Sequence, residues 1–118
     1  MTLKEFYEAA GGDYADASCR LPSDALILKF LKMVRADESF PQLSAAFQAG
    51  DVRGAFRAAH TLKGVSLNLG LSSLAEVSST LTEALRNAEA MPADADTLYA
   101  AVQREYTRVM QALDTLEG

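Results

Sequence analysis

The sequence predicts an all-α protein, an antiparallel four-helix bundle with one or two short N-terminal helices. Apolar residues recur at spacings of three and four along most of the chain, which is the period of an amphipathic helix. No run of β-branched residues alternates with polar ones, as a half-buried strand would require. At 118 residues the chain fits one domain. We expect that domain to span 1–118, with its core bundle over about 23–117.

The N-terminal residues carry the signals of two short helices. Thr2 and Glu5 have the spacing of a capping box, in which side chains pair with the free backbone N–H groups of a first turn. The apolar stripe that follows comprises Leu3, Phe6, Tyr7 and Ala10. Glycines at 11–12 end this helix, and Asp13 can cap one or two further turns over 14–19.

Two longer amphipathic segments follow. Pro22 and Ser23 open the first, which we expect to run to about Arg35. Pro41 suits the first turn of the second segment, which ends at Gly50. The inward-facing residues of the two segments are Leu26, Ile27, Phe30, Leu31, Val34, Leu43, Ala46 and Phe47.

The remaining sequence predicts three helices. Asp51 is a cap for the helix that carries His60, and Gly70 separates that helix from the next. Ser73 and Glu76 can form a capping box at the start of this next helix. The residues spaced for burial are Leu74, Val77, Leu81, Leu85 and Ala88 in one helix, and Leu98, Val102, Tyr106, Val109, Leu113 and Leu116 in a long C-terminal helix. Packing these stripes together favours an antiparallel bundle.

The composition excludes several classes of function. Sixteen acidic against eleven basic side chains leave a net charge of −5, which disfavours nucleic acid or an anionic membrane as a partner. No stretch approaches the roughly 20 apolar residues of a membrane span, and the first residues contain no signal-peptide pattern, so we expect a cytoplasmic protein. The single cysteine, Cys19, cannot form an intrachain disulfide, and with one histidine it cannot complete a zinc site, so we expect no metal or cofactor.

His60 is the only histidine, and it lies on the outer face of its predicted helix. With 100° between successive residues, the apolar side of 52–69 comprises Ala55, Ala59, Leu62, Ser66 and Leu69. Nearly opposite lies a row made of Arg53, Arg57, His60 and Gly64, with Lys63 beside it. His60 therefore points to water and is no core histidine.

Two neighbours make a function for His60 more probable than its exposure alone does. Gly64 stands inside a helix, where glycine costs roughly 1 kcal/mol relative to alanine, so some requirement must exclude a Cβ there. Lys63 brings an ammonium group to a place where it can stabilise an anion attached to the imidazole.

Four more side chains surround this row. Arg53 and Arg57 make it the basic strip of an acidic protein, although for either arginine alone a solvated face is the simpler interpretation. Phe56 and Leu67 flank the apolar stripe, and for them core packing and docking of a partner are equally good interpretations.

A histidine can act as a base, a metal ligand or a nucleophile. No second histidine is present, and no carboxylate or cysteine lies within a turn on the same face, so a metal site or a hydrolytic triad lacks local support. A nucleophile remains, because neutral imidazole can take up a phosphoryl group covalently. The chain has no nucleotide-binding loop, so the phosphoryl group must come from another protein.

At these residues the chain resembles the histidine-containing phosphotransfer (HPt) family of bacterial phosphorelays. The family signature AH-x-LKG, followed six residues later by glycine, reads AAHTLKGVSLNLG here. The resemblance implies a four-helix bundle in which His60 is the phosphoacceptor, Lys63 stabilises charge and Gly64 admits the partner. It also implies that Arg86 is a basic residue near the site. Thr82 departs from the acidic or amide residue often found at its position.

The resemblance implies a phosphocarrier rather than an enzyme. We expect its partners to be response-regulator receiver domains, such as that of a hybrid sensor kinase, with magnesium supplied by the receiver. On this interpretation Arg53, Phe56, Arg57, Leu67 and Arg86 form the docking surface, and the protein is a monomer.

Two alternatives stay open. One is a helical interaction bundle that docks a partner without covalent chemistry. The other is the phosphoacceptor module of a chemotaxis-type kinase, although a chain of 118 residues without kinase or dimerisation segments favours a free-standing carrier.

Overall fold

The computed structural model describes residues 1–117 and confirms the predicted all-α fold. The described residues form seven α-helices and one 3-10 helix, without a strand among them. The elements are α1 (Leu3–Ala10), α2 (Tyr14–Arg20), α3 (Asp24–Met33), η1 (Val34–Ala36), α4 (Ser39–Ala49), α5 (Val52–Asn68), α6 (Ser72–Leu85) and α7 (Ala95–Glu117). No helix within residues 1–117 is both long enough and apolar enough to cross a bilayer.

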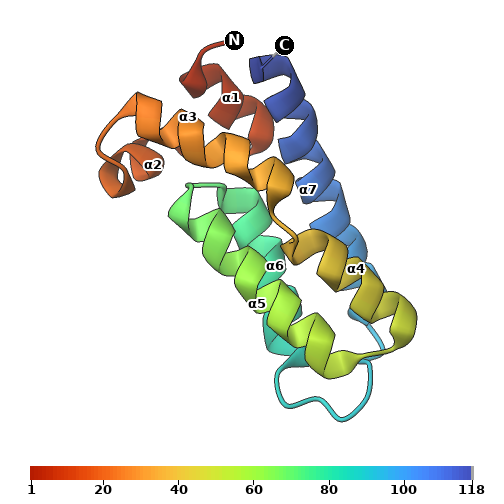
Figure 1. Ribbon diagram of the computed structural model, residues 1–118. Coiled ribbons are helices and arrows are strands. Elements are labelled where there is room, and N and C mark those ends of the chain that lie inside the picture. Colours follow the sequence, from red (N-terminus) through yellow and green to blue (C-terminus); the bar gives the residue numbers. More distant parts are fainter. Residues whose placement is uncertain (118) are drawn as a thin grey trace.

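Helices α4 to α7 form the bundle (Figure 1). Each of them runs opposite to the one before it, α5 packs against both α4 and α6, and α6 packs against α7. Stacked aromatic rings close the bundle between α4 and α7. The ring centres of Phe40 and Tyr106 lie 4.3 Å apart, and those of Phe47 and Tyr99 lie 4.7 Å apart. Helix α5 therefore has neighbours on two sides and one free face.

The three N-terminal helices cover one end of this bundle. Helix α1 packs along α7, while α2 and α3 lie over the end where α5 turns into α6 (Figure 1). The Tyr7 hydroxyl donates to the Leu69 carbonyl at 2.6 Å, and the Asp13 amide donates to the Gly70 carbonyl at 2.8 Å. Gly70 has a φ of +67°, and a Cβ there would lie 2.8 Å from the Asp13 carbonyl oxygen, so this turn requires glycine.

Most of the predicted caps are confirmed. Thr2 and Glu5 form a complete capping box, and a side-chain oxygen accepts from a first-turn amide at the predicted caps Asp13 and Asp51. Ser23, which was predicted to open a helix with Pro22, caps α3 in the same way. Gly50 ends α4 in the left-handed conformation. Asp51 and Gly50 together turn the chain directly from α4 into α5, which fixes the helix that carries His60.

The predicted box of Ser73 with Glu76 is wrong. Helix α6 begins at Ser72, two residues before the start that a cap at Ser73 implies, and its N-cap Leu71 has no capping side chain. The Ser73 amide instead donates to the Gly11 carbonyl at 3.0 Å, so a distant backbone group satisfies the donor that the box would have used. Ala88 lies beyond the end of α6.

The buried hydrogen bond from Tyr7 to the Leu69 carbonyl is expected to stabilise the fold. Burial raises the pKa of its phenol, so the hydroxyl stays protonated and donates to Leu69. Tyr7→Phe leaves that carbonyl without its donor and is expected to lower the free energy of unfolding by about 1–2 kcal/mol in urea titrations. Tyr14→Phe, which removes the exposed hydroxyl that donates to Asp24, is the control and should cost less than about 0.5 kcal/mol. Equal losses in the two variants would contradict a structural role for the buried bond.

Candidate functional site

Helix α5 presents His60 to solvent. Its inner face packs against α4 and α6, and the predicted inner residues Ala55, Ala59, Leu62 and Ser66 are all at most 2% exposed. His60 lies on the opposite side and is exposed, as are Arg53, Arg57 and Gly64. The predicted orientation of the helix is thus confirmed, and the imidazole is open to a partner.

Gly64 stands one turn beyond His60 in the same exposed row. A Cβ built at this position would meet no side chain or neighbouring helix within 4 Å among the described residues. Its φ is not positive, so the backbone does not demand glycine either. Neither packing nor conformation explains the missing side chain, and the open space beside the imidazole is its one visible consequence.

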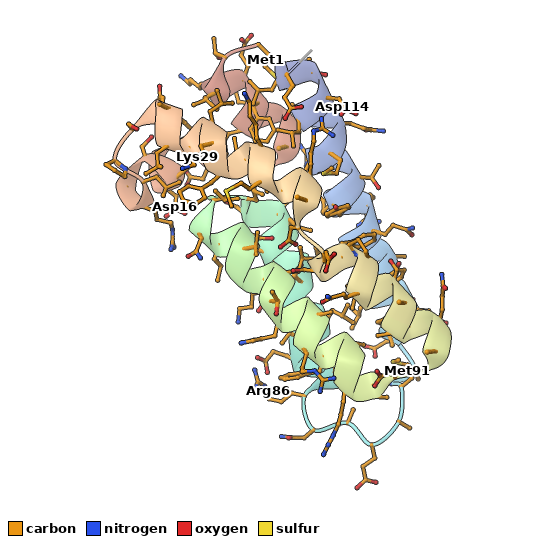
Figure 2. The ribbon with its side chains drawn as sticks, in the orientation of Figure 1. Met1, Asp16, Lys29, Arg86, Met91 and Asp114 are labelled. Atoms are coloured by element: carbon orange, nitrogen blue, oxygen red, sulfur yellow. The ribbon has the colours of Figure 1, made fainter. Side chains whose placement is uncertain are left out.

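Phe56 lies against His60 one turn before it. The two rings are stacked, with centres 6.0 Å apart and planes within 9° of parallel. The guanidinium carbon of Arg86 lies 5.2 Å from the centre of the Phe56 ring, in cation–π contact. Arg86 follows the end of α6, near the start of the loop that leads to α7 (Figure 2). The Phe56 ring therefore contacts both the imidazole of His60 and the guanidinium of Arg86.

Glu83 was not singled out by the sequence, yet it belongs to this cluster. Its carboxylate binds Arg86 through two contacts, from Nε at 3.0 Å and from Nη2 at 3.1 Å. These hydrogen bonds and the charge of Arg86 lower the pKa of Glu83, and nearby Lys63 and His60 lower it further. The spacing of three residues on one helix predicts the Glu83–Arg86 pair. Its position beside α5 depends on how the two helices pack, which the sequence does not reveal.

The basic residues of the exposed row do not lie on one side of His60. Lys63, half-buried, and Leu67, 41% exposed, line a hollow of about 330 Å³ between α5 and α6. Arg57 lines a different hollow, between α4 and α5. Lys63 therefore shares the α6 side of the helix with Arg86, and Arg57 stands apart from both.

Thr82 is fully buried within α6. Its hydroxyl donates to the Ser78 carbonyl at 2.6 Å, one turn back along the helix. The hydroxyl is thus engaged with the backbone rather than with an exposed group of α5. The polar groups nearest to His60 at this end of α6 are instead those of Glu83 and Arg86.

An apolar hollow of about 750 Å³ opens beside the C-terminal part of α5. Val65 and Leu69 form one wall, and Phe30 and Met33 of α3 form another. Met33 is 55% exposed, so its side chain borders the hollow from the solvent side. Phe30 is among the residues predicted to face inward, and the sequence does not reveal this surface, because it arises where α3 crosses α5.

Fold and site together define a helical module with one exposed histidine and the cations Lys63 and Arg86 on one side of it. No cluster of three His, Cys, Asp or Glu side chains suited to a metal ion occurs within residues 1–117. The family model for the Hpt domain matches residues 29–116, and the chain belongs to this family. Comparisons with curated proteins and with solved structures found no match.

Family membership defines the general activity. An Hpt domain takes part in histidine phosphotransfer within a phosphorelay, where it interacts with receiver domains and carries the phosphoryl group. The predicted family and its two-component signalling context are therefore confirmed.

Proposed function

We propose that this protein is a phosphocarrier that accepts a phosphoryl group on His60 from the aspartyl phosphate of one receiver domain and passes it to the aspartate of another. The observation that carries the proposal is the exposed imidazole on α5, with an open position at Gly64 on the same face. A partner's phosphorylated residue can approach such an imidazole without displacing any part of the bundle.

The transfer exchanges one bond to phosphorus for another. A ring nitrogen of His60 attacks the phosphorus, the P–O bond of the aspartyl phosphate breaks, and a P–N bond forms. The electron pair of the broken bond stays with the aspartate, which leaves as a carboxylate, and the ring keeps the proton on its other nitrogen. Passing the group onward is the reverse step with a second aspartate. Magnesium, which offsets charge during transfer, belongs to the receiver in this proposal.

Lys63 and Arg86 are the cations that we assign to the phosphorylated state. Both lie on the α6 side of His60, where a phosphoryl dianion would gain from their charge. Neither cation needs to act as an acid or base, because the imidazole is itself the nucleophile. The protein would therefore hold the phosphoryl group without catalysing its hydrolysis.

We assign receiver docking to the surface around His60. Its charged members are Arg53, Arg57 and Arg86, and its apolar members are Phe56 and Leu67. The apolar hollow at Met33 extends this surface toward α3 and supports docking of a partner with an apolar patch of its own. Basic groups suit the acidic phosphorylation pocket of a receiver.

Transfer between two purified receivers tests the proposal. Incubation with one phosphorylated receiver is expected to give a single acid-labile, base-stable modification on this protein. Addition of a second, unphosphorylated receiver should then remove it. A plain interaction bundle would bind a partner but acquire no label, and a kinase module would acquire its label from a kinase and ATP rather than from a receiver.

Lys63→Ala tests the charge that we assign to the phosphorylated state. The variant is expected to slow transfer from a receiver by about tenfold, because one preorganised cation is lost, while the melting temperature stays near that of the wild type. Transfer to the wild type should also weaken as added salt screens the encounter. Lys4→Ala, which removes the same charge from the exposed face of α1, is the control and should transfer normally. An unchanged rate in Lys63→Ala would make Lys63 a solvated lysine only.

A further inference from the structure

The guanidinium of Arg86, which lies over the Phe56 ring beside the phosphoacceptor, is already engaged. Arg86 directs Nε and Nη2 at the two carboxylate oxygens of Glu83, a paired geometry that is the strongest available to a guanidinium. Both side chains are about half exposed, at 44% for Arg86 and 55% for Glu83, so neither is locked in place by packing. The pair can exchange for another anion at modest cost.

The position of this pair would let a phosphoryl group on His60 compete with Glu83 for Arg86. The Phe56 ring contacts both groups: the guanidinium carbon of Arg86 lies 5.2 Å from its centre, and the His60 ring is stacked with it at 6.0 Å. A phosphoryl group on His60 would bring two negative charges and three acceptor oxygens into this neighbourhood. Glu83 offers Arg86 one negative charge and two oxygens. The lowered pKa of Glu83 is consistent with a carboxylate that stays ionised among these cations.

We propose that Glu83 is a positioning residue that competes with a phosphoryl group on His60 for Arg86, and so limits how strongly the histidine holds that group. The inference rests on the proposed phosphocarrier function. A carrier must release what it accepts, because a phosphohistidine that is too stable traps the group and stops the relay. Glu83 keeps the phosphorylated state from gaining the full benefit of Arg86.

The equilibrium between a phosphorylated receiver and this protein measures the competition. Glu83→Gln keeps the shape of the side chain but removes its charge, and it is expected to shift the equilibrium toward phosphohistidine by about two- to fivefold. The equilibrium constant refers to the separated proteins, so a change in docking alone does not move it. Glu8→Gln on α1 changes the net charge equally and should leave the constant unchanged.

A double-mutant cycle shows whether Glu83 acts through Arg86. Arg86→Ala is expected to lower the equilibrium constant, and Glu83→Gln added to that variant should give little or no gain. The same gain in both backgrounds would mean that Glu83 acts by its own charge, and competition for Arg86 would be wrong. An unchanged or lowered constant in Glu83→Gln alone would also overturn the inference.

Failure of the proposed function would look different. In that case the wild type would accept no phosphoryl group from any receiver, and no equilibrium could be measured. Chemical phosphorylation with potassium phosphoramidate provides a second readout, because it loads the imidazole without a receiver. The wild type could be labelled and transfer normally while Glu83→Gln has the same equilibrium constant as the wild type. That result would overturn the inference about Glu83 and leave the proposed carrier function standing.

Discussion

His60→Gln is expected to abolish phosphoryl transfer from a receiver while leaving the bundle folded. The imidazole is exposed on the free face of α5, and its neighbours on the inner face pack without it. Glutamine is polar and a good helix former, so the melting temperature should stay within a few degrees of the wild type. Its amide nitrogen is no nucleophile, so the loss should be complete rather than partial. Phosphorylated receiver and variant are incubated together, and acid-labile label is measured.

Arg104→Gln is the matched control for this experiment. It places the same new residue on an exposed position of α7, which does not adjoin α5, and it should accept label at the wild-type rate. The chain contains a single histidine, so any acid-labile, base-stable label that persists in His60→Gln would contradict the assignment directly.

The fold and the phosphoacceptor could be predicted from the sequence because their signals are local. The caps at Asp13, Ser23 and Asp51 each depend on a side chain and an amide three residues away. The orientation of α5 follows from the rotation per residue along a single helix. His60 and Gly64 share a face for the same reason, whatever the other helices do.

Contacts between elements could not be predicted in the same way. The start of α6 was misjudged because the Ser73 amide finds the Gly11 carbonyl, a partner far away in the sequence. Glu83 was missed although its pairing with Arg86 was readable from spacing, since its place beside Phe56 depends on the packing of α5 against α6. The local pattern identifies the nucleophile, and the assembled bundle identifies the charges that surround it.

Substitutions at Gly64 are expected to separate the stability of the protein from its activity. The glycine lies inside α5 with a helical backbone, and the space around its missing Cβ is open. Gly64→Ala should therefore raise the free energy of unfolding by up to about 1 kcal/mol. Gly64→Gln should raise it by a somewhat smaller amount, because glutamine is also a good helix former. If packing required a glycine at this position, both substitutions would instead lower the free energy of unfolding.

Activity should separate the two variants. The alanine methyl group adds little bulk, so Gly64→Ala is expected to transfer at close to the wild-type rate and serves as the matched control. The Gly64→Gln side chain would stand where a receiver must approach His60, and transfer from the receiver should fall by at least about tenfold. Phosphoramidate is small enough to reach the imidazole past this side chain, so chemical labelling of the two variants should remain alike. A folded Gly64→Gln protein that accepts the receiver's phosphoryl group at the wild-type rate would remove the steric explanation. Equal losses with receiver and phosphoramidate would place the effect on the imidazole itself rather than on access.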